Sequence, residues 1–176
     1  MSKLSAGILL FKVGDNDVLE VLIAHPGGPF WAKKDEAAWS IPKGEYLEGE
    51  DAYEAAHREF REELGMDAPS RSSIDLGEIK QSSGKRIRVW AIEGNLDASK
   101  IESNTFAMEW PPKSGQYADF PEVDRAAWEP IGVARRKVHK GQVDFLSRLI
   151  DALSDEGRVG VNEGTDDEPS PQSSLF

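Results

Sequence analysis

Cysteine is absent from the 176-residue sequence. Its absence excludes disulfide bonds, thiolate metal sites and a cysteine nucleophile, and it is consistent with a reducing compartment. Long hydrophobic runs are also missing, because no apolar stretch approaches the roughly 18 residues that a membrane-spanning helix needs. The first residues lack the basic, apolar and small-residue order of a secretory signal. We therefore expect a cytoplasmic protein without a membrane partner.

Positive charge is scarce as well. Lys and Arg number 21 against 32 Asp and Glu, which gives a formal net charge of −11. Such an acidic surface repels a phosphate backbone, which argues against a protein that coats DNA or long RNA. A small polyphosphate stays compatible with this charge, provided that bound cations invert the local field.

The chain length suits one domain with a single core. Apolar runs at residues 4–11 and 18–25 flank a Gly-Asp-Asn-Asp turn, which predicts a hairpin. Further strand patterns are present at residues 39–42, 74–81, 85–93, 105–110 and 126–131. We expect residues 26–38, 44–51 and 111–121 to be loops, because Pro and Gly interrupt them or polar residues fill them.

Helical patterns occupy fewer segments. Residues 52–64 are followed by Gly65, a residue favoured just past a helix C-terminus. Residues 133–137 indicate a helical turn or two, and apolar spacing over 142–153 predicts an amphipathic helix. After residue 153 the composition becomes acidic and rich in Pro, Ser and Gly, which predicts a disordered tail over 154–176. The expected architecture is an α/β domain over residues 1–153, with a mixed sheet flanked by helices.

Three carboxylates gather on the first of these helices. Glu59, Glu62 and Glu63 have i, i+3, i+4 spacing, so they project from one side of the helix. Their charges repel one another near the negative end of the helix dipole, which works against helix stability. Hard divalent cations would relieve this repulsion, although a Glu-rich helix face is more often only a solvated surface.

The stretch over residues 44–66 resembles the Nudix box. The box requires Gly, five residues, Glu, seven residues, Arg-Glu, an apolar residue, any residue, Glu-Glu, any residue, Gly and an apolar residue. A chance match in a chain of this length has a probability on the order of 10⁻⁷. The resemblance implies a MutT-like Nudix hydrolase with the Nudix fold, a mixed β-sheet between helices. All nine specified positions are filled, by Gly44, Glu50, Arg58, Glu59, Phe60, Glu62, Glu63, Gly65 and Met66.

The resemblance also implies roles for residues of the box. In this family the helical glutamates bind divalent metal, so Glu59, Glu62 and Glu63 are implied metal ligands and catalytic residues. Gly44 begins the loop whose backbone carbonyl is a further implied ligand. Arg58 is similar to the family arginine that orients a glutamate by hydrogen bonding. The implied cofactor is Mg²⁺ or Mn²⁺.

Family members often take a further ligand or a general base from outside the box. The candidates are Glu102, Glu109 and Glu122, and we favour Glu122 because the sequence PEVD at 121–124 resembles the loop carboxylate of RNA pyrophosphohydrolase-like members. The alternative is a glutamate on a solvated turn. Within the box, Glu50 is implied to hold loop and helix together. The implied reaction is substitution by water at phosphorus, in which a glutamate accepts the proton of the water.

The residues before the box bear on the substrate. The sequence WSIPKG at 39–44 resembles the entry of dinucleoside polyphosphate, diphosphoinositol and decapping members, and Lys43 is a candidate phosphate contact or else a solvated lysine. The tyrosine that often marks dinucleoside polyphosphate members is missing at 81–83, and Lys80 replaces the proline typical of ADP-ribose pyrophosphatases.

Three functions stay open on this basis. The favoured one is a pyrophosphohydrolase of nucleoside diphosphate-linked substrates, with dinucleoside polyphosphates ahead. The alternatives are a 5′-end RNA pyrophosphohydrolase and a non-catalytic nucleotide-binding regulator. Isomerase chemistry of the isoprenoid type relies on a cysteine in this family and is excluded.

Two further groups of side chains are candidates for substrate contact. Basic residues near one strand could reach phosphate, although a solvated sheet face is the simpler interpretation. Aromatic residues could stack on a base, although ordinary packing is the better expectation for each. These candidates are Lys85, Arg86 and Arg88 for phosphate, and Trp31, Tyr46 and Trp90 for stacking.

Overall fold

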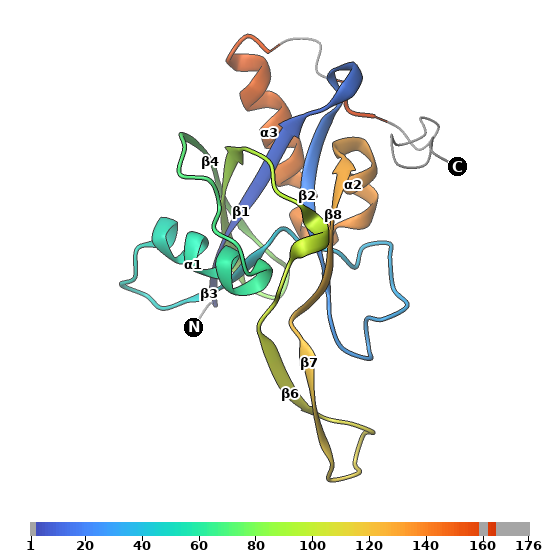
Figure 1. The fold of residues 1–176 in the computed structure, drawn as a ribbon. Coiled ribbons are helices and arrows are strands. Elements are labelled where there is room, and N and C mark those ends of the chain that lie inside the picture. The colour runs from blue at the N-terminus through green and yellow to red at the C-terminus, as the bar shows by residue number, and fades with distance from the viewer. Residues whose placement is uncertain (1–2, 159–161, 165–176) are drawn as a thin grey trace, which may run out of the picture.

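The computed structural model describes residues 3–158 and 162–164. A six-stranded sheet forms the middle layer, helix α1 covers one face, and helices α2 and α3 cover the other (Figure 1). A two-stranded hairpin of β6 and β7 extends away from this body (Figure 1). The strands are β1 (Leu4–Val13), β2 (Leu19–Pro26), β3 (Lys43–Tyr46), β4 (Ser73–Lys80), β5 (Arg86–Glu93), β6 (Thr105–Glu109), β7 (Tyr117–Pro121) and β8 (Val123–Pro130). The helices are α1 (Ala52–Leu64), α2 (Ile131–Lys137) and α3 (Val143–Asp155), with short 3₁₀ turns η1 (Asp15–Asp17), η2 (Ala98–Lys100) and η3 (Lys140–Gln142).

Strand β1 is buried on both faces. Because side chains alternate along a strand, Ile8 and Leu10 pack in the cluster under α1, whereas Leu9 and Phe11 pack under α2 and α3. All four side chains are buried. This double burial explains why residues 4–11 form an almost continuous apolar run rather than an alternating one.

The edge of β1 is shared by two antiparallel strands. β3 pairs with β1 over residues 4–7, and β2 pairs with it over residues 11–13, while β5 pairs in parallel on the other edge. The strand order is β4-β5-β1-β2-β8, with β3 attached to β1. This arrangement places β3 against α1 and brings the loop before the helix onto the sheet.

Most of the expected elements are confirmed. The hairpin of β1 and β2, the strand patterns near 74–81, 85–93, 105–110 and 126–131, and all three helices are present. Helix α1 has the predicted bounds, and Gly65 follows it with a φ of +71° in the left-handed region. The mixed sheet between helices is therefore the fold class that the sequence predicts.

Three expectations were wrong. Residues 44–46, where a loop was expected, belong to β3, because β1 offers an open edge to pair with. Residues 117–121 form β7 where a loop was expected, because they pair with β6. Residues 39–42 form no strand, since Trp39 and Ser40 make only isolated bridges to Val138 and Ala24.

The predicted tail begins close to the last helix. Helix α3 continues through Asp155, and Asn162 pairs with Val18 next to β2. Residues 159–161 and 165–176 of the predicted tail lie outside the described residues, so tail disorder stays a prediction. No helix in the described ranges is both long and apolar enough to span a membrane.

Candidate active site

Helix α1 holds the predicted carboxylates in place. The Asp51 side chain caps its first turn by accepting a hydrogen bond from the Glu54 backbone N–H at 3.0 Å. The apolar face of the helix packs on the sheet through Ala56, Phe60 and Leu64, all buried. The same helical period turns Glu59, Glu62 and Glu63 away from this core, as half-buried side chains.

Gly44 lies directly against Glu59. A Cβ atom at position 44 would lie 1.9 Å from Glu59 Oε2, far inside any permitted contact. Only glycine therefore lets β3 approach the carboxylate of the helix so closely. This contact brings the Gly44 backbone and one predicted metal ligand to the same place.

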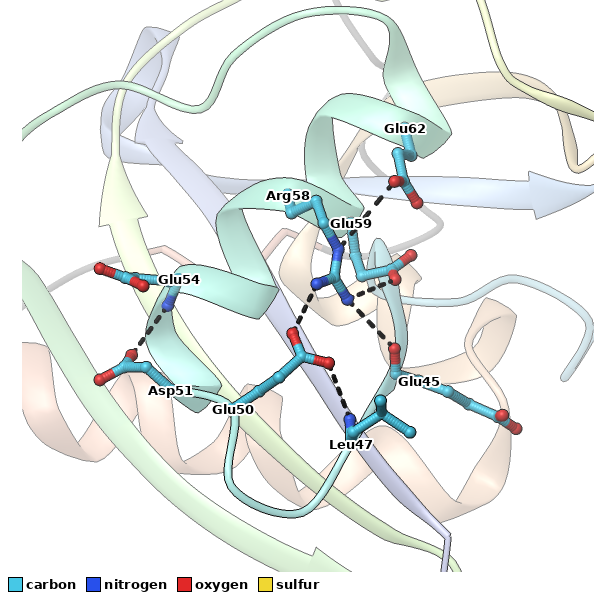
Figure 2. A network of polar contacts seen from close by, with 8 residues as sticks. All are labelled: Glu45, Leu47, Glu50, Asp51, Glu54, Arg58, Glu59 and Glu62. Carbon is cyan, nitrogen blue, oxygen red and sulfur yellow. Dashed lines mark hydrogen bonds and ion pairs between the residues drawn. The ribbon is translucent and has the colours of Figure 1, made fainter.

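Arg58 connects the loop before α1 to the carboxylates on it (Figure 2). Its guanidinium donates to Glu50 at 2.6 Å and to Glu59 at 3.2 Å, and it also donates to the Glu45 carbonyl oxygen at 3.4 Å. Its Nε lies 4.0 Å from Glu62. The loop and two of the three helical carboxylates are thus held by one cation.

Glu50 completes this connection from the loop side (Figure 2). One oxygen accepts from Arg58, and the other accepts from the Leu47 backbone N–H at 2.9 Å. Both bonds favour the charged form, so the backbone N–H of Leu47 and then Arg58 lower the pKa of Glu50. Glu50 therefore fixes the loop relative to the helix and does not face the other carboxylates of the site.

Glu63 is tied to the strand that carries Gly44. Its Oε1 accepts a hydrogen bond from the Lys43 backbone N–H at 2.9 Å. Burial raises the pKa of Glu63 to about 7, against the opposing effects of the Lys43 N–H and the Lys43 ammonium, and the charges of Glu122 and Glu59 add to the rise.

Glu122 joins the helical carboxylates from the turn between β7 and β8. Desolvation and then the charge of Glu62 raise its pKa. Desolvation also raises the pKa of Glu59, where hydrogen bonding to Arg58 opposes the rise and the charges of Glu62 and Glu122 add to it. Glu122, which is distant from α1 in the sequence, therefore repels the carboxylates of that helix across one site.

This cluster has the chemistry that a divalent cation requires. Its donors are hard carboxylate oxygens beside the Gly44 backbone, and burial first, then the charges of neighbouring carboxylates, raise the pKa values of Glu59 and Glu63. As placed in the described chain, no three acidic or histidine side chains converge closely enough to form a ready-made metal site. The residues fit a metal by donor type and charge, as an open cluster.

Lys43 is the cation nearest to this cluster from β3. Its side chain is half-buried and lies beside that of Lys85. Burial and the positive charge of Lys85 lower its pKa, while the charge of Glu63 opposes the change. Two ammonium groups that repel each other next to carboxylates form a candidate site for phosphate oxygens.

The other candidates for the general base and for phosphate contact lie outside the carboxylate cluster. Glu109 accepts from the Lys113 backbone N–H at 2.6 Å in the hairpin turn, away from α1. Arg86 pairs with Glu78 at 3.5 Å, and Arg88 pairs with Asp75 at 2.7 Å. Both arginines therefore pair with carboxylates of strand β4, as expected for a solvated sheet face. Glu102 is exposed beside the end of α1, where its backbone N–H donates to the Leu64 carbonyl oxygen.

The three aromatic candidates have different surroundings. Trp90 is buried and contacts the Tyr53 ring edge-on, with 5.2 Å between centroids. Tyr46 is half-buried against the core under α1. Trp31 is 38% exposed and lines a cavity of about 370 Å³ that also includes Glu122. Among these three, Trp31 is the aromatic side chain that faces the site.

Sequence reasoning missed two parts of this region. His25 is buried, and its ring nitrogens face Asp124 at 2.9 Å and the Lys34 carbonyl oxygen at 2.6 Å, which ties the loop over 27–38 to β8. Phe30, Phe106 and Met108 line the cavity with Trp31. No spacing in the sequence signals the contact of His25 with Asp124, or the joint lining of the cavity by Phe30 and Phe106, because these residues are far apart in the sequence.

A larger cavity of about 770 Å³ lies between β8 and residues 95–101. Its described lining includes Lys12, whose Nζ lies 4.1 Å from the centroid of the Trp128 ring. It includes none of the carboxylates of α1. The size of this cavity therefore does not make it the reactive centre.

Comparison with known proteins gives a consistent result. A family model described as NUDIX domain matches residues 1–149. An RNA pyrophosphohydrolase of Rhizobium meliloti (strain 1021) is 31% identical over 134 residues, which cover 64% of this chain and 74% of the relative.

Solved structures show the same fold at low sequence identity. A C. elegans Ap4A hydrolase in a binary complex has a TM-score of 0.61 at 18% identity, covering 87% of this chain and 98% of that chain. The NUDIX domain of Shewanella oneidensis NrtR complexed with ADP ribose has a TM-score of 0.60 at 14% identity, covering 87% and 89%. At these identities the similarity establishes the architecture alone.

Proposed function

Because the chain belongs to the Nudix family and is a hydrolase of pyrophosphate bonds, we propose that it is a metal-dependent enzyme for nucleoside diphosphate-linked substrates. Dinucleoside polyphosphates are the preferred class, on the strength of the sequence WSIPKG that leads into the box. One observation carries the proposal: four carboxylates repel one another at a site where Gly44 has no room for a side chain beside Glu59.

Glu59, Glu62, Glu63 and the Gly44 carbonyl would hold Mg²⁺ or Mn²⁺. When bound, the metal supplies Lewis acidity, which polarises phosphate oxygens and lowers the pKa of water. Arg58 positions Glu59 through the 3.2 Å hydrogen bond, and Glu50 keeps Arg58 in place.

Proton transfer and charge binding fall to residues outside α1. Glu122 accepts the proton of the attacking water, whose oxygen forms a new bond to phosphorus. The bridging P–O bond breaks, and the leaving phosphate takes its electron pair. Lys43 binds a phosphate oxygen and stabilises the negative charge, because its ammonium interacts electrostatically with Glu63 and lies beside that of Lys85.

A second candidate is removal of pyrophosphate or phosphate from the 5′ end of RNA. The relative from Rhizobium meliloti carries that name, and the PEVD sequence at 121–124 supports it. The net charge of −11 opposes it, because a long phosphate backbone would be repelled. Incubation with triphosphorylated RNA and with dinucleoside polyphosphates separates the two, since faster turnover of the RNA would replace the first proposal.

The deciding experiment is a panel of nucleotide substrates with Mg²⁺ and with Mn²⁺, with products identified by chromatography. Glu63→Gln abolishes turnover and leaves the circular dichroism spectrum unchanged, because the substitution removes a charge without removing volume. Glu54→Gln, an exposed change in the first turn of the same helix, is the matched control and keeps the normal rate. A near-normal rate in Glu63→Gln would remove this residue from catalysis. Metal-dependent hydrolysis of any nucleotide in the panel dismisses the non-catalytic regulator, and no hydrolysis with either metal contradicts the proposed substrate class.

A further inference from the structure

An apolar cavity adjoins the carboxylate cluster. It has a volume of about 370 Å³, within the range of roughly 300–1,000 Å³ for small-molecule pockets. The loop after β2 forms one wall and strand β6 forms the other. The described lining residues are Pro26, Gly27, Gly28, Phe30, Trp31, Phe106, Met108 and Glu122.

The two walls pack on each other. Phe30 meets the Trp110 ring edge-on, with 5.4 Å between centroids and an interplanar angle of 88°. Gly28 has a φ of +96°, and a Cβ there would lie 3.2 Å from the Phe106 ring, so the loop approaches β6 closely. These contacts within the protein hold the two walls of the cavity together.

Aromatic surface is left exposed at this cavity. Phe30 is 55% exposed and Trp31 is 38% exposed, although such side chains bury well in a core. Lys34 Nζ lies 4.9 Å from the centroid of the Trp31 ring. Exposed aromatic rings that line a pocket beside a reactive site are a platform for a planar ligand group.

Glu122 joins the cavity to the reactive centre. Its carbonyl oxygen accepts from the Gly27 backbone N–H at 3.0 Å, and its own N–H donates to the Asn104 carbonyl oxygen at 2.8 Å. Both walls are thereby anchored at this residue. Its carboxylate interacts with Glu62 and Glu59 across the site. Glu122 alone would therefore separate a ligand group in the cavity from substrate phosphates bound at the carboxylate cluster.

We propose that this cavity receives the base of a nucleotide substrate by stacking and apolar contact, without selecting among bases. The proposal rests on the proposed function, which supplies a nucleotide whose phosphates lie on the carboxylate side. Among the described lining side chains only Glu122 and the Trp31 indole carry polar groups, so no set of side-chain donors and acceptors reads a base edge. None of the described residues that line the cavity is basic, so a phosphorylated group such as diphosphoinositol does not fit it.

Uncharged nucleosides test the cavity without metal or turnover. Saturation-transfer NMR is recorded with adenosine, guanosine and ribose on the whole protein. Adenosine and guanosine give signals at their base protons, with dissociation constants within about threefold of each other, because stacking is tolerant of base identity. Ribose gives none. Trp31→Ala loses the nucleoside signals, whereas Trp31→Phe keeps them because an aromatic ring remains.

Tyr117→Ala is the matched control. Tyr117 is an aromatic residue of the β6–β7 hairpin that is 72% exposed and lies outside the cavity lining. This variant keeps the nucleoside signals. Absence of nucleoside binding in the unmodified protein, or undiminished binding in Trp31→Ala, overturns the proposal. A strong preference for one base overturns the claim that bases are not selected.

Turnover gives a second measurement. Trp31→Ala raises KM for a nucleotide substrate about tenfold and leaves kcat nearly unchanged, because one stacked base is lost and the reacting atoms are untouched. If no substrate is hydrolysed, the proposed function fails, and the nucleoside experiment still decides whether the cavity binds a base.

Discussion

At the scale of single residues, the contact between Gly44 and Glu59 restricts position 44 to glycine. A methyl group at position 44 would overlap the Glu59 carboxylate, with its Cβ 2.1 Å from Cδ and 1.9 Å from Oε2. The carboxylate must then move, and with it the hydrogen bond to Arg58. We expect Gly44→Ala to lower kcat/KM by roughly 100-fold, which corresponds to about 2.7 kcal/mol of transition-state stabilisation. Steady-state kinetics at saturating Mg²⁺ measures the loss.

Gly49→Ala is a suitable control for this prediction. Gly49 lies in the turn between β3 and α1, and a Cβ there would meet nothing within 4 Å, although its φ of +98° makes alanine strained. We expect that variant to lose about 1–3 kcal/mol of stability and to keep its turnover. Equal loss of activity in both variants would mean that loop flexibility, and not the Glu59 contact, requires glycine at position 44.

At the scale of elements, a charged hydrogen bond ties β4 to β5 where their register shifts. Arg88 Nη2 donates to Asp75 Oδ2 at 2.7 Å, and the Gly77 N–H donates to Oδ1 at 2.8 Å. Arg88 and then the Gly77 N–H lower the pKa of Asp75, against partial desolvation. Asp75→Asn retains an acceptor for Gly77 and removes the charge, so it isolates the contribution of the arginine.

We expect Asp75→Asn to lower the free energy of unfolding by at most about 1 kcal/mol at pH 7, because both partners are largely solvated. A carboxyl group whose pKa is lowered by folding stabilises the protein above its unfolded pKa. The difference between variant and parent is therefore full above about pH 4 and disappears as the pH falls through the lowered pKa of the folded state. Urea unfolding across this range measures it. A difference that persists unchanged in acid would contradict the argument.

Strands β3 and β7 mark the limit of prediction from local sequence. Residues 43–46 read Lys-Gly-Glu-Tyr, which lacks apolar alternation, and they form a strand because β1 leaves that edge unpaired. Residues 117–121 read Tyr-Ala-Asp-Phe-Pro after a Pro- and Gly-containing turn, and they pair with β6. In both cases the partner strand decides the structure, whereas the buried strands and amphipathic helices are decided by their own apolar pattern.

At the scale of the whole molecule, negative charge is in excess. The net charge is −11, and four of the carboxylates face one another across one site. Mg²⁺ bound there at 100 times its dissociation constant would stabilise the folded state by about 2.7 kcal/mol, a rise in melting temperature of roughly 5–10 °C. Thermal unfolding with and without Mg²⁺ measures this.

Sodium chloride at matched ionic strength separates specific binding from general screening. Screening raises the melting temperature with either salt, whereas binding gives an additional rise with Mg²⁺ that a chelator reverses. Glu63→Gln should lose the additional rise. Equal melting temperatures in the two salts would remove the cation from the proposed mechanism.

The sequence predicted one half of the candidate site and not the other. Glu59, Glu62 and Glu63 could be placed together because a helix converts their spacing into one surface. Glu122 could be proposed from its resemblance to a family loop, and its charge interacts with theirs in the structure. The cavity could not be predicted, because Trp31 and Phe106 are distant in the sequence and line it together only once the fold brings the loop after β2 beside the β6–β7 hairpin.

Strand β1 has the most constrained position in the molecule. It pairs with β2, β3 and β5, and its successive side chains alternate between the helix layers on its two faces. Adding or removing one residue would exchange the two sets of side chains and shift the pairing of three neighbours together. During evolution this strand can therefore accept apolar replacements of similar volume, whereas insertion or deletion of a single residue would disrupt the fold.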